Sequence, residues 1–354
     1  MGKDKLTRIA IVGCGGFSKN YLPVYRNFEN TEISICCDAD ITAAQSMAKM
    51  LGARKASADF SDVVAAEVDY VVLSTPNFLH VEQASALIDS GKHVLLQKPL
   101  ARNVAEASQL LSILEKNRNL QIGMYMSMLD FGLWWELRNA ISNEKVLGSV
   151  AQISMRLGHT GGLLWNSEAK NLWRFSKEKT GGGAFIMLGV HYIHFLRWLL
   201  GSKLTRVCAQ VSNLHCPRIE GEDICQIQAE MENGTLVQLS VAWNSQGEHF
   251  AIYGTEGSLV YLDNELLRIH GVKPWKTSYF EYTELKSWQN FDGIVPPPLD
   301  DGQNSYNQHR AFLEAVRTNS KPAVDLVQGY WDMLVTEAVY KSASNGGWET
   351  VSYE

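Results

Sequence analysis

The sequence lacks the features that mark several broad classes of protein. It contains six cysteines but no C-x-x-C pair, so it predicts neither a zinc site nor a disulfide framework. Cysteines without such a framework fit a reducing cytoplasm, where we expect the protein to reside. The histidines also lack ligand spacing with acidic residues on a shared face, so no metal site is predicted.

Long apolar runs and blocks of positive charge are missing as well. No apolar stretch reaches roughly 18 residues, the length needed to cross a membrane, so no membrane partner is expected. The net charge is −6, from 32 basic and 38 acidic residues without a basic block, which argues against nucleic acid as a partner. The chain also shows no internal repeat and no low-complexity segment.

The composition that remains is that of an ordinary globular protein. Of 354 residues, 45% are hydrophobic and 20% are charged, a balance that can fill a substantial core. A chain of this length favours two domains over one.

Strand and helix patterns alternate over residues 1–124. Short apolar runs such as RIAIVG (Arg8 to Gly13) and VDYVVLS (Val68 to Ser74) are separated by helical stretches. One of these stretches opens with Asn103 and Glu106 at the spacing of a capping box. Apolar strands that alternate with helices predict a parallel sheet covered by helices on both faces.

The pattern changes near Val150, where strands with alternating polar and apolar residues begin. Asn233-Gly234 is a strong hairpin turn between two of them. We therefore predict an α/β protein of two domains. Residues 1–124 form a doubly wound parallel sheet, and residues 125–354 form an α/β domain with an open, largely antiparallel sheet.

A glycine-rich turn follows the first strand. The residues Gly13-Cys14-Gly15-Gly16-Phe17-Ser18 match G-x-G-x-x-G, except that Ser18 replaces the last glycine. Gly13 permits the tight turn, and Gly15 lets the backbone approach a pyrophosphate. The N–H groups at the start of the next helix favour an anion. We therefore predict that this turn, including Gly16 and Phe17, binds a dinucleotide.

Asp38 lies 20 residues beyond Ser18, at the end of the second strand. A carboxylate at this place binds the two ribose hydroxyls and repels a 2′-phosphate, so the sequence favours NAD(H) over NADP(H). The alternative interpretation is an exposed turn acid, and Asp40 is a second candidate for the ribose contact.

Further stretches, taken with the glycine turn, resemble a known family. They are TPNFLH (75–80), QKP (97–99), GGGAFIMLGVHYIH (181–194), YGTEGSL (253–259) and KPAVDLVQGYWDMLVTEAVYKSA (321–343). Over almost its whole length the chain resembles the Gfo/Idh/MocA family of sugar and cyclitol oxidoreductases. The resemblance implies an N-terminal Rossmann domain that binds NAD and a carbohydrate substrate. It also implies a C-terminal sheet that often forms the interface of a homodimer or homotetramer.

Lys98 aligns with the catalytic lysine of that family. It precedes Pro99, which restrains the backbone, and it follows a predicted strand. Desolvation and a cationic nicotinamide ring would both lower the pKa of this lysine and suit it to carry a proton. The alternative is a solvated surface lysine. Gln97 is a departure, because the family usually has a glutamate there.

The resemblance also implies a loop on the cofactor side. Thr75, Pro76 and Asn77 belong to the loop whose backbone and amide groups hold the nicotinamide ribose in the family, and Gln97 and Lys98 lie on the neighbouring strand end. His80 is assigned to the same loop. The alternative for His80 is a hydrogen-bonded histidine at the start of a helix.

The segment 181–191 usually reads G-G-G-x-x-x-D-x-G-x-H in the family. His191 matches the histidine, whereas Met187 stands where the aspartate is expected. A helix turns by roughly 100° per residue, so Met187, His191 and His194 should share one face. The resemblance implies that His191 acts as general acid or base on a substrate hydroxyl. For His194 the alternative is a structural histidine bonded to the backbone.

The missing carboxylate would normally orient the imidazole of His191. Candidates to replace it are Tyr125, Asp130 and His159. The wall of the substrate site is assigned to residues 156–175, where Trp165 and Trp173 could stack on a sugar.

Positive charge in the same wall favours an anionic substituent on the substrate, such as a phosphate, carboxylate or sulfonate. It comes from Arg156, His159, Lys170 and Arg174. Scattered surface charges are the alternative. The full predicted substrate set is Tyr125, Arg156, His159, Trp165, Trp173, Arg174, Met187 and His191.

Three functions follow from these residues. The first is an NAD(H)-dependent oxidoreductase that transfers a hydride between nicotinamide and a ring carbinol of a sugar or cyclitol, with Lys98 and His191 moving the proton. The second is a lyase or glycosidase that uses NAD for a transient oxidation, which the altered residue at Met187 keeps open. The third is a non-catalytic NAD-binding regulator, against which the presence of Lys98 and His191 argues.

Overall fold

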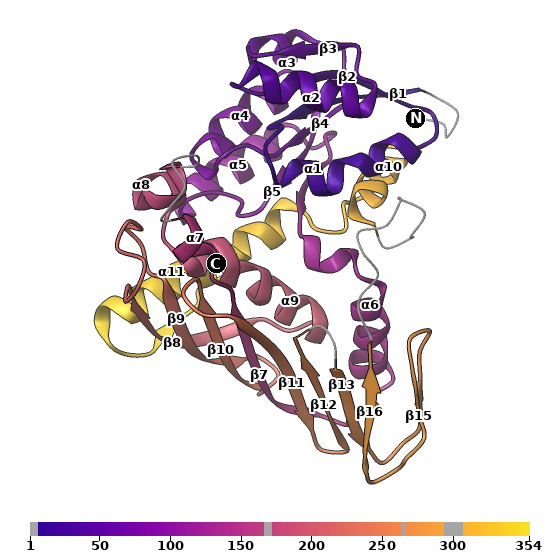
Figure 1. The fold of residues 1–354 in the computed structure, drawn as a ribbon, viewed down its shortest axis with the longest axis vertical. Helices are drawn as coiled ribbons and strands as arrows, with labels where there is room; N and C mark the ends of the chain where they lie inside the picture. Colours follow the sequence, from indigo (N-terminus) through magenta and orange to yellow (C-terminus); the bar gives the residue numbers. More distant parts are fainter. Residues whose placement is uncertain (1–5, 166–171, 264–265, 294–306) are drawn as a thin grey trace. The chain divides into compact units, whose positions relative to one another are not determined.

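The computed structural model describes residues 6–165, 172–263, 266–293 and 307–354, and the chain divides into two compact units. The first unit holds residues 1–130 and 297–330, and the second holds residues 131–296 and 331–354. This division differs from a single boundary after residue 124. Helix α10 (Gln308–Thr318) returns late in the chain and packs its apolar side chains into the core of the first unit (Figure 1).

The first unit contains a six-stranded sheet in the order β3-β2-β1-β4-β5-β6. Its strands are β1 (Thr7–Val12), β2 (Thr31–Cys37), β3 (Lys55–Ser57), β4 (Tyr70–Leu73), β5 (His93–Gln97) and β6 (Ile122–Tyr125). All neighbouring strands run parallel, which confirms the predicted parallel sheet. The strand order reverses between β1 and β4, and ligands of such sheets bind at the carboxyl edge beside this point.

Helices connect these strands and cover the sheet. They are α1 (Ser18–Tyr21), the 3₁₀ helix η1 (Leu22–Asn27), α2 (Ile41–Leu51), α3 (Ser61–Ala65), α4 (Asn77–Asp89), α5 (Val104–Lys116) and the 3₁₀ helix η2 (Ser127–Asp130). The capping prediction for α5 is confirmed on one side, because Asn103 accepts the N–H of Glu106. The carboxylate of Glu106 instead accepts the N–H of Arg102 at 3.0 Å.

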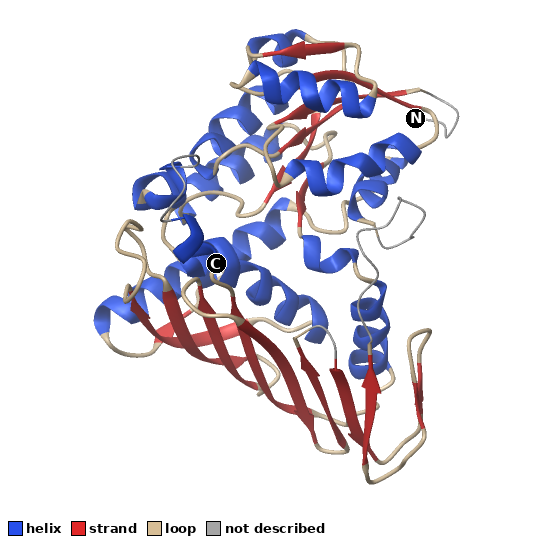
Figure 2. Cartoon of the chain, viewed as in Figure 1, coloured by secondary structure: helices blue, strands red, loops and turns tan. Residues whose placement is uncertain are grey.

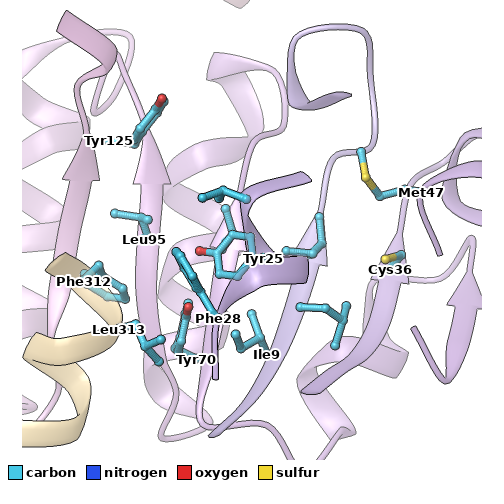
Figure 3. Close-up of a cluster of buried hydrophobic side chains, with 14 of the residues drawn as sticks. Ile9, Tyr25, Phe28, Cys36, Met47, Tyr70, Leu95, Tyr125, Phe312 and Leu313 are labelled. Atoms are coloured by element: carbon cyan, nitrogen blue, oxygen red, sulfur yellow. The ribbon is translucent and has the colours of Figure 1, made fainter. Parts of the chain in front are cut away.

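A cluster of buried hydrophobic side chains, five of them aromatic, packs against the sheet and includes Phe312 and Leu313 of α10 (Figure 3). The rings of Tyr70 and Phe312 meet edge to face with centroids 5.3 Å apart. Tyr25 packs against His309 in the same way, and its hydroxyl lies 2.9 Å from the Nδ1 atom of His309. The late segment of the chain is therefore part of this core.

His309 makes the first unit sensitive to acid. Its side chain is fully buried, and this burial lowers its pKa from 6.5 to about 3. Between about pH 6.5 and pH 3, His309 is therefore protonated in the unfolded chain and neutral in the folded protein. The free energy of unfolding falls as the pH drops through this range. We expect this single group to cost roughly 3 kcal/mol of stability at pH 4. Thermal unfolding midpoints measured between pH 7 and pH 4 will test this.

The matched variants are His309→Gln, which cannot titrate, and His215→Gln, which replaces an exposed histidine. The first should weaken the dependence of the midpoint on pH, and the second should leave it unchanged. Equal dependence on pH in all three proteins would show that His309 is not the group responsible.

The second unit is built on a nine-stranded sheet in the order β16-β13-β12-β11-β7-β10-β9-β8-β17 (Figure 2). Its strands are β7 (Val150–Gly158), β8 (Leu204–Ser212), β9 (Ile224–Met231), β10 (Leu236–Ala242), β11 (Gly247–Gly254), β12 (Gly257–Leu262), β13 (Leu266–Gly271), β16 (Trp288–Asp292) and β17 (Glu349–Thr350), with β14 (Trp275–Lys276) and β15 (Glu281–Tyr282) forming a separate pair. In this nine-stranded sheet β7 and β10 are parallel and the other paired strands are antiparallel, so the prediction of a largely antiparallel sheet is confirmed. The predicted hairpin at Asn233-Gly234 joins β9 to β10, and Gly234 has a φ of 86°.

Helices cover one face of this sheet. The helical elements are α6 (Gly132–Arg138), the π-helical turn η3 (Asn139–Asn143), α7 (Gly161–Trp165), the 3₁₀ helix η4 (Leu172–Phe175), α8 (Lys177–Thr180), the π-helical turn η5 (Phe185–Gly189), α9 (Val190–Leu200) and α11 (Leu326–Asn345). Phe250 of β11 contacts Trp134 of α6 and Phe195 of α9. The opposite face is polar and holds a cavity of about 520 Å³.

One helical segment, Lys177–Leu200, is long and apolar enough to cross a membrane by length and composition. In this fold 83% of its most apolar window is buried inside the protein, as in a core helix. Over the described ranges, no group of three or more histidine, cysteine, aspartate or glutamate side chains is placed to hold a metal ion.

Candidate active site

The glycine turn between β1 and α1 lies directly against the end of β4. Gly13 has a φ of 89°, and a Cβ atom at this residue would lie 2.5 Å from the carbonyl oxygen of Ser74. The N–H of Gly13 donates to the carbonyl of Cys37 at 2.8 Å. Both the left-handed backbone and the close approach require glycine at this position.

Gly15 and Gly16 differ from Gly13, because a Cβ atom on either would meet no protein atom within 4 Å. Both are exposed, and so is the side chain of Phe17 that follows them. Protein packing therefore does not explain these two glycines. Free space above an exposed backbone is what a bound pyrophosphate requires.

Ser18 and Asp38 hold the turn in place. The Ser18 hydroxyl is buried and donates to the carbonyl of Gly13 at 2.8 Å. One carboxylate oxygen of Asp38 accepts the N–H of Cys14 at 2.7 Å, and the other accepts the N–H of Asp40 at 2.9 Å. A carboxylate offers about four acceptor positions, so Asp38 keeps capacity for two further donors such as ribose hydroxyls.

The loop after β4 is fixed by hydrogen bonds that involve Thr75 and His80. The Thr75 hydroxyl donates to Gln83 at 2.7 Å. Asn77 is buried at the first position of α4, after Pro76 at the N-cap. His80 is fully buried, and its two ring nitrogens lie 2.8 Å from the carbonyl oxygens of Thr75 and Pro99. This geometry matches the alternative interpretation of a hydrogen-bonded histidine near a helix start.

The end of β5 presents Lys98 at the same carboxyl edge. Lys98 is half-buried and precedes Pro99, and the peptide bond between them is cis. Gln97 is buried, and its side-chain oxygen accepts the N–H of Lys98 at 2.9 Å. The glutamine that replaces the expected glutamate therefore contacts the backbone of the lysine.

These residues form a chemically suitable site for a dinucleotide. The backbone of Gly15 and Gly16 would hold the pyrophosphate, Asp38 the adenosine ribose, and the loops after β4 and β5 the nicotinamide end. All of them follow strands of one parallel sheet, so they meet at its carboxyl edge.

In the second unit, the glycine run 181–183 allows two close approaches. A Cβ atom on Gly182 would lie 2.0 Å from the Tyr340 hydroxyl, and one on Gly183 would lie 2.1 Å from the carbonyl oxygen of Glu222. Glu222 is buried, and its carboxylate accepts the N–H groups of Gly183 and Phe185. Burial raises the pKa of Glu222, and these donors oppose that effect.

A π-helical turn, η5, follows this anchored start and continues directly into α9. Met187 lies inside the turn, and His191 lies one residue beyond the start of α9. Both side chains are half-buried, in contrast to their mostly buried neighbours. Such turns are frequent at functional sites.

His194 does not share this half-exposed surface. It is buried, and its Nδ1 atom lies 2.8 Å from a carboxylate oxygen of Asp332 in α11, which also pairs with Arg197. His194 therefore belongs to the contact between α9 and α11. This fits the alternative of a structural histidine, except that the partner is a side-chain carboxylate and not the backbone.

Part of the predicted substrate wall lies close to these helices. His159 follows β7, and its Nδ1 atom accepts the N–H of Gly161 at 2.9 Å. Trp173 is half-buried, with the guanidinium of Arg174 5.4 Å from the centre of its ring. The carbonyl of Phe175 accepts the N–H of Glu220, which brings this stretch beside the loop that carries Glu222. The side chain of Trp165 and all of Lys170 lie outside the described residues.

The structure does not place Arg156 with the other predicted substrate residues. Ile153 and Met155 on the same strand are buried under the helices. Arg156 lies opposite His249 of the neighbouring strand β11, and both line the cavity on the other, polar face of the sheet. The Arg156 guanidinium donates to the Ser245 hydroxyl at 2.7 Å. Successive strand residues point to opposite faces, so the assignment of Arg156 to the wall of the substrate site is wrong.

The structure also differs from the prediction that Tyr125 contacts the substrate or orients His191. It is buried in the core of the first unit, where its hydroxyl donates to Asp130 at 2.8 Å and its ring lies 4.5 Å from that of His309. Asp130 in turn accepts the N–H of Gln308. Both candidates to orient His191 from this region are thus part of a buried network, and Tyr125 is not exposed to contact a substrate.

Sequence reasoning missed Glu222 and Tyr340, which anchor the start of the helix that carries His191. The hydroxyl of Tyr340 donates to the Glu222 carboxylate at 2.9 Å. No motif marks either residue, because they meet only when the loop before β9 packs against helix α11. The glycine run 181–183 was the one sign of a close contact at that place.

Comparison with known protein families matches two successive segments of the chain. Residues 7–124 match "Oxidoreductase family, NAD-binding Rossmann fold", and residues 134–260 match "GFO/IDH/MocA C-terminal domain".

Named relatives and a solved structure are similar over most of the chain. The 1,5-anhydro-D-fructose reductase of Ensifer adhaerens is 26% identical, covering 79% of this chain and 79% of the relative. The D-apiose dehydrogenase of Paraburkholderia graminis is 24% identical, covering 95% and 88%. The structure of levoglucosan dehydrogenase with NADH and levoglucosan matches with a TM-score of 0.83 at 20% identity, covering 98% of this chain and all of that one, a likeness of fold.

Proposed function

The chain belongs to the GFO/IDH/MocA family of NAD-binding oxidoreductases, and on that premise we propose that it transfers a hydride between NAD(H) and a ring carbinol of a sugar, a sugar derivative or a cyclitol. The observation that carries the proposal is the convergence of the open glycine turn, Asp38 and Lys98 at the carboxyl edge of one parallel sheet. The sugar-acting relatives support the substrate class.

The residues around the glycine turn would select NAD(H). Asp38 already accepts two backbone N–H groups, so its carboxylate is held beside the turn. A fixed negative charge there binds ribose hydroxyls and repels the 2′-phosphate of NADP(H). The nicotinamide, when bound, supplies the hydride chemistry, and the protein moves the proton.

We assign the proton to Lys98 and His191. The Nζ atom of Lys98 would take the hydroxyl proton during oxidation and return it during reduction, and the imidazole of His191 would hold or relay the same proton. Met187 has no carboxylate with which to orient this imidazole. Glu222 fixes the backbone at the start of η5, which continues directly into the helix that carries His191.

The charge of the substrate rests on fewer residues than the sequence indicates. Arg156 lies on the far face of the sheet and does not contribute to the predicted wall. Arg174, beside Trp173, remains as an arginine of that wall. We therefore propose a neutral sugar ring or one with a single anionic substituent, stacked on Trp173.

The test is an absorbance assay of the purified protein with NAD⁺ and a panel of sugars, anhydrosugars, sugar acids and cyclitols. We expect NADH to form with at least one of them, with kcat/KM at least about tenfold higher for NAD⁺ than for NADP⁺. Asp38→Ser should remove this preference, and Asp40→Ser, a change at an exposed neighbouring acid, should keep it.

Two results would overturn the proposal in different ways. Cleavage of glycosides that needs NAD⁺, builds up no NADH and takes up deuterium at C2 would indicate the elimination chemistry of the second hypothesis. Tight NADH binding without turnover on any member of the panel would indicate a regulator.

A further inference from the structure

His80 joins the two loops that flank the nicotinamide end of the predicted cofactor site. The side chain comes from the first turn of α4 and has no exposed surface. Its Nε2 atom lies 2.8 Å from the carbonyl oxygen of Thr75, two residues after β4. Its Nδ1 atom lies 2.8 Å from the carbonyl oxygen of Pro99, two residues after β5. One rigid ring therefore bridges two separate strand ends.

The bridge to Pro99 fixes the residue next to Lys98. On the other side, the side-chain oxygen of Gln97 accepts the N–H of Lys98 itself at 2.9 Å. The backbone of the lysine is thus held from both sides by buried polar side chains. The chain beyond it is held as well, because Arg102 pairs with Glu106 at the start of α5.

The protonation state of the His80 imidazole depends on its hydrogen bonds and on the charge of Lys98. Both partners of His80 are carbonyl oxygens, which only accept, whereas a neutral imidazole has a single N–H to donate. Burial lowers the pKa of His80 and the charge of Lys98 lowers it further, while the two carbonyls and the carboxylate of Glu106 raise it. Protonation of His80 and protonation of Lys98 therefore oppose each other.

We propose that His80 is a positioning residue for Lys98. It holds the Pro99 carbonyl against the loop after β4 and so keeps the ammonium group of Lys98 at the angle and charge state that proton transfer needs. This inference rests on the proposed function of Lys98. It predicts an effect on the chemical step and little effect on binding, because displacement of a catalytic group by about 1 Å can cost about a hundredfold in rate.

The variants are His80→Phe, which keeps a ring without hydrogen bonds, and His80→Gln, whose amide nitrogen still donates to carbonyl oxygens. We expect His80→Phe to lower kcat by about 30- to 100-fold, with KM for the sugar and Kd for NADH changed by less than about threefold. His80→Gln should recover at least about a third of the lost rate.

The matched control is His93→Phe at the start of β5, the strand whose other end precedes Lys98. His93 also contacts the backbone, since its Nδ1 atom accepts the N–H of Gln121 at 2.7 Å. This variant should lower the thermal midpoint as much as His80→Phe does while leaving kcat within twofold of the native value. Equal losses of kcat in the two variants would reduce His80 to a structural role and overturn the inference.

A second readout does not depend on turnover. Lysine acylation followed by mass spectrometry, at a series of pH values, reports how readily the Nζ atom of Lys98 loses its proton. In His80→Phe this profile should move toward that of the exposed Lys116 in the same protein, and in His93→Phe it should not move. An unchanged Lys98 profile in His80→Phe would overturn the inference.

The two readouts also separate this inference from the proposed function. A shifted Lys98 profile in a protein that oxidises no sugar would support the positioning of Lys98 by His80 and reject the proposed substrate class. Sugar oxidation with the same kcat in His80→Phe and the native protein would support the proposed function and reject the positioning of Lys98 by His80.

Discussion

Replacing Lys98 by alanine is expected to lower kcat for sugar oxidation by at least about a hundredfold, while the Kd for NADH changes by no more than a few fold. A positioned proton carrier contributes about 10²- to 10⁴-fold to such a step, and alanine removes it completely. Lys98 is half-buried, so alanine leaves no large enclosed cavity and we expect the protein to stay folded. Steady-state kinetics and a fluorescence titration with NADH measure the two quantities.

The control is Lys116→Ala, which removes an exposed lysine from α5 in the same unit. Its kcat should equal that of the native protein. If Lys98→Ala kept more than about a tenth of the native kcat, the assignment of the proton to Lys98 would have to be abandoned.

Gly13→Ala should remove NADH binding and destabilise the first unit by roughly 2–5 kcal/mol. The φ of 89° is unfavourable for alanine, and the new methyl group would lie 2.5 Å from the carbonyl of Ser74, where the backbones of two strands meet. The turn and the end of β4 must separate to accept it. Denaturant unfolding and a calorimetric NADH titration give both numbers.

Gly15→Ala separates the two reasons for glycine in this turn. Its methyl group would meet no protein atom within 4 Å, so stability should stay within about 0.5 kcal/mol of the native value. Because the same space is assigned to the pyrophosphate, the Kd for NADH should still rise by at least about tenfold. Native affinity in Gly15→Ala would move the proposed pyrophosphate site elsewhere.

Local signals in the sequence predicted much of the fold. Apolar runs between helices identified the parallel strands, Asn233-Gly234 identified a hairpin, and Asn103 identified the start of α5. Each of these depends on residues close in the chain. The glycine turn and Asp38 belong to the same class, because strand, turn and acid follow one another within the first 38 residues.

The errors concern residues whose surroundings come from distant parts of the chain. Tyr125 is buried because His309 and Gln308, more than 180 residues later, pack around it and Asp130. His194 is buried because Asp332 of α11 meets it. No pattern near Tyr125 or His194 in the sequence indicates these distant residues.

Arg156 fails for a different reason. The alternation of β7 places it on the open face, although His159 and Trp165 follow it closely in the sequence. Face, and not sequence distance, decides which side chains of a strand meet.

The late return of the chain has a consequence for biosynthesis. The core of the first unit lacks Phe312, Leu313 and Val316 until α10 has left the ribosome, and the second unit lacks most of α11 and strand β17 until residues 331–350 have emerged. Neither unit can complete its core before these late segments have emerged. Nascent chains arrested before residue 307 should therefore remain open to proteases and chaperones in both units.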